Sequence, residues 1–220
     1  MRIRALHPWD VSPKEAVGIQ RRLAGSVLTQ GRVPSLRRVA GVDVGFEHAN
    51  TVTRAAVAVL GYPDLEPLTS AVARRPTTFP YVPGLLSFRE IPAVLDALQA
   101  LTVAPDVLLC DGQGIAHPRR FGIACHLGVL TDLPAVGVAK SRLIGEFDPP
   151  PQTKGAWRPL TDKGECIGAV LRTRANTRPL FISVGHRLGL PEAIDIVMGC
   201  TPRYRLPETT RAAHRLASGH

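Results

Sequence analysis

The sequence has no pair of closely spaced cysteines. Its four cysteines, Cys110, Cys125, Cys166 and Cys200, are scattered along the chain. Zinc knuckles and thioredoxin-type redox sites use a C-x-x-C or similar spacing, so neither class of site is expected. We expect free, buried thiols, as is usual for a protein of the reducing cytoplasm.

Long apolar runs are also missing. No segment approaches the roughly 20 apolar residues of a membrane-spanning helix. The first residues, MRIRALHP, lack the apolar stretch of a secretory signal. We therefore expect a cytoplasmic protein with no membrane partner. The sequence has no internal repeats and no low-complexity tracts. Its 220 residues, 45% of them hydrophobic, are enough for one catalytic domain over 1–220 with a sizeable core. We expect this domain to be a monomer.

Lysine is scarce among the basic residues. Only four of the 27 basic side chains are lysines, and 18 acidic residues leave a net charge of +9. Arginine suits bidentate contact with phosphate, and a basic surface favours nucleic acid as a partner. An arginine- and alanine-rich composition can also reflect coding bias. The charge therefore favours an anionic polymer as partner without deciding the matter.

The hydrophobic pattern predicts an α/β protein. Strands are expected over 39–46, 54–60, 65–74, 107–110, 135–139, 165–172 and 179–184, and helices over 14–30, 88–101, 121–130, 191–198 and 207–217. The first three strands are joined by short loops and should be antiparallel, whereas later strands separated by helices should be parallel. A mixed sheet in this order, flanked by helices, is the ribonuclease H-like arrangement.

Two aspartates have similar apolar surroundings. Asp111 ends the run DVLLC and opens the turn GQG, and Asp43 lies in the run VAGVDVGF. In the predicted fold these acids stand at the ends of neighbouring strands, where α/β proteins build their sites. An Asp beside Gly can also be an ordinary turn residue. Paired carboxylates in a basic chain indicate metal-assisted chemistry on an anionic polymer.

The segment between the two aspartates contains an aromatic residue between two prolines. Pro80 and Pro83 should stiffen the loop and hold Tyr81 at a tip, where it could act as a wedge between stacked bases. The alternative is an ordinary buried tyrosine. Further along, the run SFRE fits a capping box, which would make Glu90 a structural residue at the start of a helix.

Five blocks of sequence together resemble the endonuclease V family. They are GVDVGF at 41–46, PYVPGLLSFRE at 80–90, DGQGIAHPR at 111–119, GVAK at 137–140 and YRLPE at 204–208. The resemblance runs from about residue 13 to residue 218. It implies a ribonuclease H-like, metal-dependent DNA repair endonuclease that recognises deoxyinosine. Such an enzyme cuts the second phosphodiester bond 3′ to the lesion and leaves 3′-hydroxyl and 5′-phosphate ends.

The resemblance also implies roles for individual residues. The expected catalytic residues are Asp43, Glu90, Asp111, Lys140 and His214, a role that takes precedence over the capping role for Glu90. Asp43 and Asp111 would hold Mg²⁺, the usual ion, which prefers oxygen ligands. The residues matching the wedge and the pocket for the flipped base are Pro80, Tyr81, Val82, Pro83, Gly84, Leu86, Gly112, Gly122 and Leu143. Whether one or two ions act is left open.

One residue departs from the family pattern. Many relatives have His where this chain has Gln113, and Gln can neither act as a base nor carry positive charge. We interpret this position as peripheral to catalysis. His117, in the same turn, is predicted to bind substrate and to supply any phosphate contact that is lost.

Two other functions remain open. The same catalytic apparatus could act on inosine in RNA, as an endoribonuclease. A decayed nuclease fold could instead serve as a non-catalytic nucleic-acid-binding module, although the intact set of acids argues against it.

Overall fold

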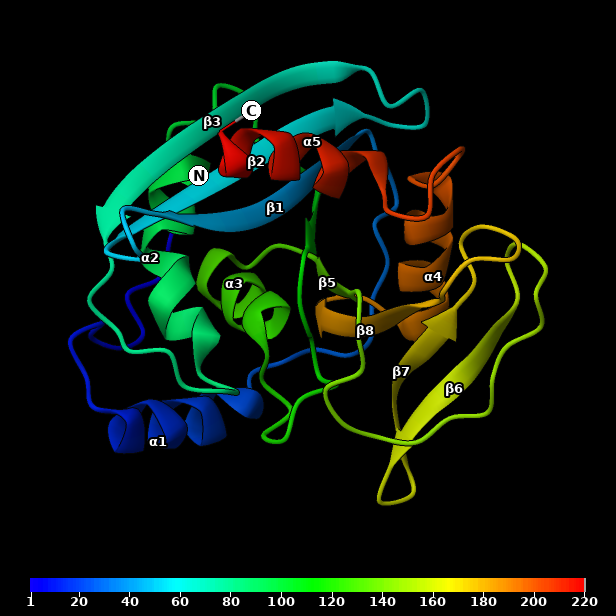
Figure 1. The fold of residues 1–220 in the computed structure, drawn as a ribbon, viewed down its shortest axis with the longest axis horizontal. Helices are drawn as coiled ribbons and strands as arrows, with labels where there is room; N and C mark the ends of the chain where they lie inside the picture. The colour runs from blue at the N-terminus through cyan, green and yellow to red at the C-terminus, as the bar shows by residue number, and fades with distance from the viewer. Residues whose placement is uncertain (220) are drawn as a thin grey trace.

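A mixed sheet forms the centre of the protein (Figure 1). The computed structural model describes residues 1–219, and within them the sheet has eight strands in the order β3-β2-β1-β4-β5-β8-β7-β6. The strands are β1 (Arg38–Glu47), β2 (Val52–Gly61), β3 (Pro67–Pro76), β4 (Val107–Cys110), β5 (Ala135–Ala139), β6 (Trp157–Asp162), β7 (Glu165–Leu171) and β8 (Leu180–His186). The helices are α1 (Pro13–Ala24), α2 (Leu86–Gln99), α3 (Ile123–Thr131), α4 (Leu190–Gly199) and α5 (Glu208–Ser218).

The strand directions confirm the predicted arrangement and extend it. β1, β2 and β3 are antiparallel, β4 runs parallel to β1, and β5 runs parallel to β4. The far side of the sheet differs, because β8, β7 and β6 are antiparallel to their neighbours. β6 was not expected from the sequence. It is an edge strand that contains Pro159 and has a single buried residue, Leu160, so it lacks the apolar pattern of a buried strand.

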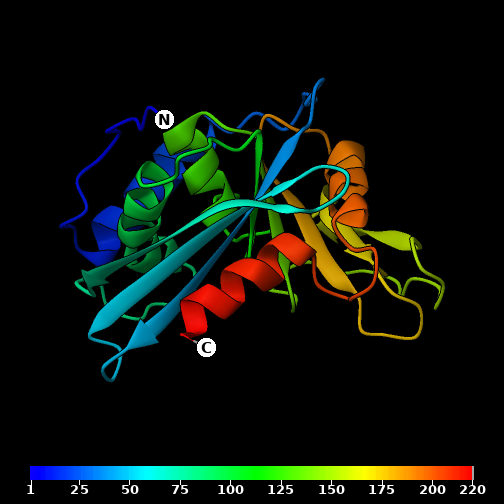
Figure 2. The ribbon, with the colours of Figure 1, turned by 90° about the horizontal axis from the view of Figure 1, so that it is seen from above.

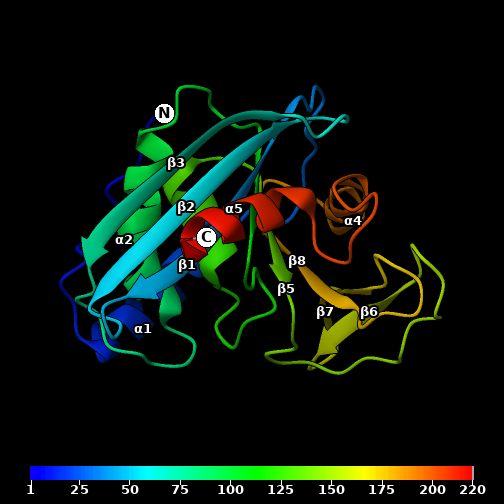
Figure 3. The same ribbon diagram turned by 45° about the horizontal axis from the view of Figure 1, so that its top comes forward.

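Helices cover both faces of the sheet (Figure 2). On one face α2 packs against β1, β2 and β3, and α3 packs against β4, β5 and β8. On the other face α4 packs against β7 and β8. α5 lies on β1 and β2 on the face opposite α2 (Figure 3). α1 packs with its apolar residues against the start of α2 and against α3. The two acids predicted from the sequence therefore lie at the centre of the sheet, on and directly after the neighbouring strands β1 and β4.

The outcome for the cysteines is mixed. Cys110, Cys125 and Cys200 are free and buried, as expected, but Cys166 on β7 is free and exposed. Of the helices formed by residues 1–219, none has the length and the apolar character that crossing a membrane requires.

Candidate active site

Asp43 and Asp111 lie side by side because β1 and β4 are parallel neighbours. The register pairs Val42 with Cys110, and the N–H of Asp111 donates to the carbonyl of Val42 at 3.1 Å. Asp111 follows the last residue of β4, as predicted. Asp43 is not at a strand end, since β1 continues to Glu47 beyond the end of β4. The long strand β1 therefore carries Asp43 one residue past its last pairing with β4, while Asp43 remains paired with Ala56 of β2.

α5 crosses β1 directly over Asp43. A Cβ atom on Gly41 would lie 2.0 Å from the carbonyl oxygen of Thr209, and one on Gly45 would lie 2.6 Å from that of Ala217. Residues 41, 43 and 45 share one face of the strand, so the two glycines allow the helix to approach on either side of the aspartate. As a result His214 Nδ1 lies 2.7 Å from Asp43 Oδ2.

Glu90 reaches the two aspartates from α2. The three carboxylates line one cavity of about 130 Å³, together with apolar residues of β1, β4 and α3. α2 begins at Leu86, its N-cap residue is Leu85, and no side chain caps it. The capping-box prediction is therefore wrong, because the helix starts one residue before the serine that would have capped it.

The three carboxylates strongly affect one another. Burial raises the pKa of Glu90 to about 8, and the charges of Asp43 and Asp111 contribute to that rise. The pKa of Asp43 is also raised, by burial and by the charge of Asp111, while the hydrogen bond with His214 partly offsets the effect. Three acids with this environment require nearby positive charge to be ionised together at neutral pH.

Lys140 supplies part of that charge. β5 is parallel to β4, so Lys140, immediately after β5, lies beside Asp111 and its Nζ forms an ion pair with that carboxylate. Over residues 1–219, no ready-made group of three or more His, Cys, Asp or Glu side chains has the spacing of a metal site. In the structure the Asp43 carboxylate is hydrogen-bonded to His214, and the Asp111 carboxylate is paired with the ammonium group of Lys140.

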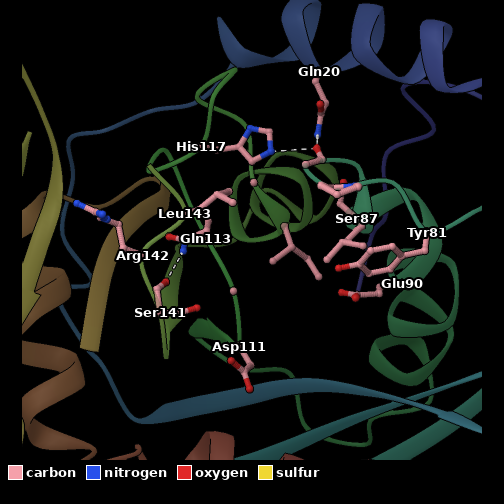
Figure 4. Close-up of a pocket in the computed structure, with 16 residues that line it drawn as sticks. Gln20, Tyr81, Ser87, Glu90, Asp111, Gln113, His117, Ser141, Arg142 and Leu143 are labelled. Carbon is pink, nitrogen blue, oxygen red and sulfur yellow. Dashed lines mark hydrogen bonds between the residues drawn. The ribbon is translucent and has the colours of Figure 1, made fainter. Parts of the chain in front are cut away.

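A second cavity, of about 250 Å³, adjoins the acids and shares Glu90 and Asp111 with them (Figure 4). Eight of the residues proposed from the sequence to bind substrate line it: Tyr81, Pro83, Gly84, Leu86, Gly112, His117, Gly122 and Leu143. Pro80 and Val82 are not among its lining residues. Residues that sequence reasoning did not single out also line it: Gln20, Ser87, Ile123, Ser141 and Arg142.

Tyr81 stands at the mouth of this cavity and is 70% exposed. The alternative in which it is a buried core residue is therefore wrong. The loop turns back at Val82–Leu85, where the Leu85 N–H donates to the Val82 carbonyl at 2.9 Å. Pro83 and Gly84, with φ of +78° at the glycine, have the conformations typical of a type II turn. The turn directly follows Tyr81, whose side chain lines the cavity and remains largely exposed to solvent.

His117 departs from its predicted phosphate contact. Its side chain is buried, 3% exposed, and the backbone N–H of Arg119 donates to its Nδ1 at 3.2 Å. Nε2 therefore carries the proton and donates to the carbonyl of Gly84 at 2.9 Å. Burial lowers the pKa of His117 to about 4, so the ring is neutral. This histidine holds the cavity wall rather than a phosphate.

Gln113 lies in the cavity wall. Its side-chain amide donates to the carbonyl of Ser141 at 3.1 Å, and its Oε1 is buried without a hydrogen-bond partner in the described part of the chain. It ties the turn after β4 to the loop after β5, which is a structural role that needs neither charge nor basicity.

Comparison with known proteins agrees with this geometry. The family model described as Endonuclease V matches residues 21–215. The chain is 58% identical over 219 residues to an endonuclease V of Trichormus variabilis, covering 99% of both chains. A crystal structure of endonuclease V from Streptomyces avermitilis superimposes with a TM-score of 0.92 at 44% identity, over 99% of this chain and 96% of that one.

A further solved structure contains nucleic acid. It is an endonuclease V of Ciona intestinalis in complex with a 23mer DNA that contains an inosine followed by a ribo-adenosine. It superimposes with a TM-score of 0.84 at 27% identity, over 95% of this chain and 98% of that one. With the family model and a close relative each matching nearly the whole sequence, the chain belongs to the endonuclease V family.

Proposed function

We propose that residues 1–220 form a single catalytic domain that recognises deoxyinosine in DNA. It hydrolyses the second phosphodiester bond on the 3′ side of the lesion in a metal-dependent reaction. The proposal rests on one observation: two cavities lie next to each other and share residues. A cluster of three carboxylates shares Glu90 and Asp111 with a base-sized, glycine-lined pocket. Recognition and hydrolysis would then take place on one continuous surface.

The carboxylate cluster fits Mg²⁺. Asp43 and Asp111 offer oxygen ligands of the kind this ion prefers, and the raised pKa values of Asp43 and Glu90 reflect acids that lack sufficient positive charge nearby. When bound, the ion would supply positive charge to the scissile phosphate and to the departing 3′ oxygen. Lys140, released from Asp111, would contact the phosphate, and Glu90 and His214 would orient the attacking water.

The second cavity suits an extruded hypoxanthine. Gly112, Gly122 and Ile123, at the N-terminus of α3, line it. The N–H of Gly122 already donates to the carbonyl of Gly114 at 3.0 Å, so the backbone N–H groups of Gly112 and Ile123 are the ones that can donate to the O6 and N7 acceptors of the base. The 2-amino group of guanine would be excluded by close packing, and adenine presents a donor where hypoxanthine has O6. The inosine-containing DNA bound to the Ciona intestinalis relative supports this choice of substrate.

A nicking assay tests the proposal directly. A duplex with one deoxyinosine should be cut in Mg²⁺ at the second bond 3′ to the lesion, and the same duplex without the lesion should remain intact. A matched ribo-inosine strand distinguishes the RNA-directed alternative. A protein that binds both duplexes but cuts neither would be the non-catalytic module.

Non-specific DNA binding should weaken steeply as salt rises. The 27 basic residues against 18 acidic ones favour phosphate contacts, which release counterions on binding. If six or more phosphates are contacted, affinity should fall by about 10³-fold or more between 50 and 200 mM salt. Fluorescence anisotropy of an undamaged duplex measures this. A dissociation constant that stays flat over the range would attribute the charge to composition alone.

Replacing Tyr81 with alanine should reduce discrimination between inosine-containing and normal DNA. The exposed ring is free to stack in the gap left by an extruded base. Stacking of an aromatic residue on a base is worth roughly 1–3 kcal/mol, so the ratio of the two affinities should fall by about 5- to 150-fold. The ratio is measured by competition binding, with the melting temperature recorded in parallel.

Tyr81→Phe is the matched control for this prediction. It keeps the ring and should retain most of the discrimination. Both variants should melt near the wild-type temperature, because the side chain makes few packing contacts. An early-melting Tyr81→Ala with an unchanged affinity ratio would contradict the wedge role.

A further inference from the structure

The carbonyl oxygen of Gly84 accepts three hydrogen bonds. Gln20 Nε2 donates at 2.9 Å, His117 Nε2 at 2.9 Å and Arg119 Nη2 at 2.8 Å. Figure 4 shows the bonds from Gln20 and His117 meeting at this one atom. A buried carbonyl needs one donor to offset its desolvation and has two lone pairs. Three converging donors, one of them a guanidinium, hold this peptide unit far more firmly than burial requires.

Gln20 connects this carbonyl to the opposite wall of the base-sized cavity. It lies on α1 and is 1% exposed, and the same Nε2 also donates to the carbonyl of Phe121 at 3.2 Å. Phe121 precedes Gly122 at the start of α3. One side chain therefore ties the turn that carries Tyr81 to the turn that opens α3. Gly84 and Gly122, one from each of these turns, both line the cavity.

Arg119 completes the connection. Its Nε donates to Gln20 Oε1 at 2.5 Å while its Nη2 donates to Gly84. Among the residues that the structure describes, no carboxylate forms an ion pair with Arg119, so the orientation of its guanidinium depends on Gln20 and Gly84. A Cβ atom on Gly84 would lie 2.8 Å from Arg119 Nη2, so the guanidinium packs directly against the glycine.

We propose that Gln20 is a positioning residue for inosine recognition. It acts through Gly84 and Phe121, by setting the width of the pocket and the position of the turn that presents Tyr81. This inference rests on the proposed function, since it concerns the pocket assigned to the base. Gln20 belongs to the buried face of α1, otherwise formed by Ala16, Ile19 and Leu23. A fully buried amide on an apolar helix face thus directs its donor at the carbonyls of Gly84 and Phe121 and its acceptor at Arg119.

Gln20→Met tests the proposal. Methionine has a similar length and flexibility but removes both the donor and the acceptor. Binding to inosine-containing duplex, measured by anisotropy with Ca²⁺ in place of Mg²⁺, should weaken about tenfold or more, while binding to undamaged duplex stays within about twofold. When the cleavage rate in Mg²⁺ is measured over a range of substrate concentrations, kcat should change much less than KM, because the acids and Lys140 are untouched.

Gln20→Glu separates the two halves of the amide. It keeps an acceptor for Arg119 but places a carboxylate oxygen against the carbonyls of Gly84 and Phe121. It should therefore fail to restore discrimination, even though its bond to Arg119 is preserved. If Gln20→Met does not fold, the same comparison of binding to inosine-containing and undamaged duplexes is made with Gln20→Glu. A Glu variant with wild-type discrimination would overturn the proposal.

Thr201→Val is the control for a loss of buried hydrogen bonding. Thr201 is 1% exposed, and its hydroxyl donates to the Val197 carbonyl in α4 at 3.1 Å, away from the pocket. It should lower the melting temperature without changing the affinity ratio. If Gln20→Met behaves in the same way, Gln20 is only structural and the inference fails. A wild type that binds inosine and undamaged duplexes equally would overturn the proposed function itself.

Discussion

Replacing Asp43 or Asp111 with alanine should abolish cleavage of inosine-containing DNA and preserve most of the binding. Each substitution removes an oxygen ligand from the carboxylate cluster. Asp43 does not line the base-sized cavity and Asp111 lines it only where it meets the cluster, so the other residues of the cavity, Tyr81 included, are unchanged. A loss of several kcal/mol of transition-state stabilisation corresponds to at least about a thousandfold in rate, at ~1.4 kcal/mol per factor of ten. Single-turnover nicking over a range of Mg²⁺ concentrations gives the rate, and anisotropy gives the affinity.

Asp162→Ala is the matched control for these variants. Asp162 on β6 also pairs with a cation, Arg120, at 2.8 Å, but it lies outside the carboxylate cluster. It should cut at close to the wild-type rate. Near-normal turnover in Mg²⁺ by Asp43→Ala or Asp111→Ala would contradict the assignment of the metal site.

The parts of the site that lie on neighbouring strands could be predicted from the sequence. Asp43 and Asp111 stand in apolar runs whose order along the chain determines which strands are adjacent, so their proximity follows from topology. The sequence does not show why glycines flank Asp43. That reason requires knowing that α5 lies against residues 41 and 45, a contact between segments more than 160 residues apart.

Residues whose roles depend on tertiary contacts could not be assigned from local pattern. SFRE satisfies the capping-box rule, yet α2 starts at Leu86 and Ser87 bonds His126 instead, because packing against α3 determines where the helix begins. Gln20 gave only a weak signal, a polar residue at a position where the helix pattern is apolar. Its hydrogen-bond partners lie in two turns that are distant in the sequence, and the spacing of apolar residues along α1 does not indicate them.

Glu90→Gln should stabilise the metal-free protein while removing its activity. Burial and the charges of Asp43 and Asp111 raise the pKa of Glu90 to about 8, so the folded protein resists ionising this group. A raised folded pKa contributes stability that is fully present below the unfolded value, near 4.5, and is lost as pH rises toward 8. Glutamine does not titrate, so it contributes no such pH dependence to the stability. The carboxylate is therefore kept at a cost in stability, as expected for a functional group.

Thermal unfolding in EDTA at pH 5 and pH 8.5 measures this cost. The variant and the wild type should melt close together at pH 5. At pH 8.5 the variant should be more stable by on the order of 1–3 kcal/mol, or several degrees. Mg²⁺ should reduce this difference in stability between the variant and the wild type, because a cation favours the ionised Glu90 and leaves glutamine unaffected. The variant should cut inosine-containing DNA at least about a hundredfold more slowly, since an amide can neither accept a proton nor hold a cation as a carboxylate does. If the variant and the wild type melted at the same temperature at both pH values, burial and the charges of the two aspartates would not raise the pKa of Glu90. A Glu90→Gln variant that still cuts inosine-containing DNA would show that Glu90 is not a catalytic residue.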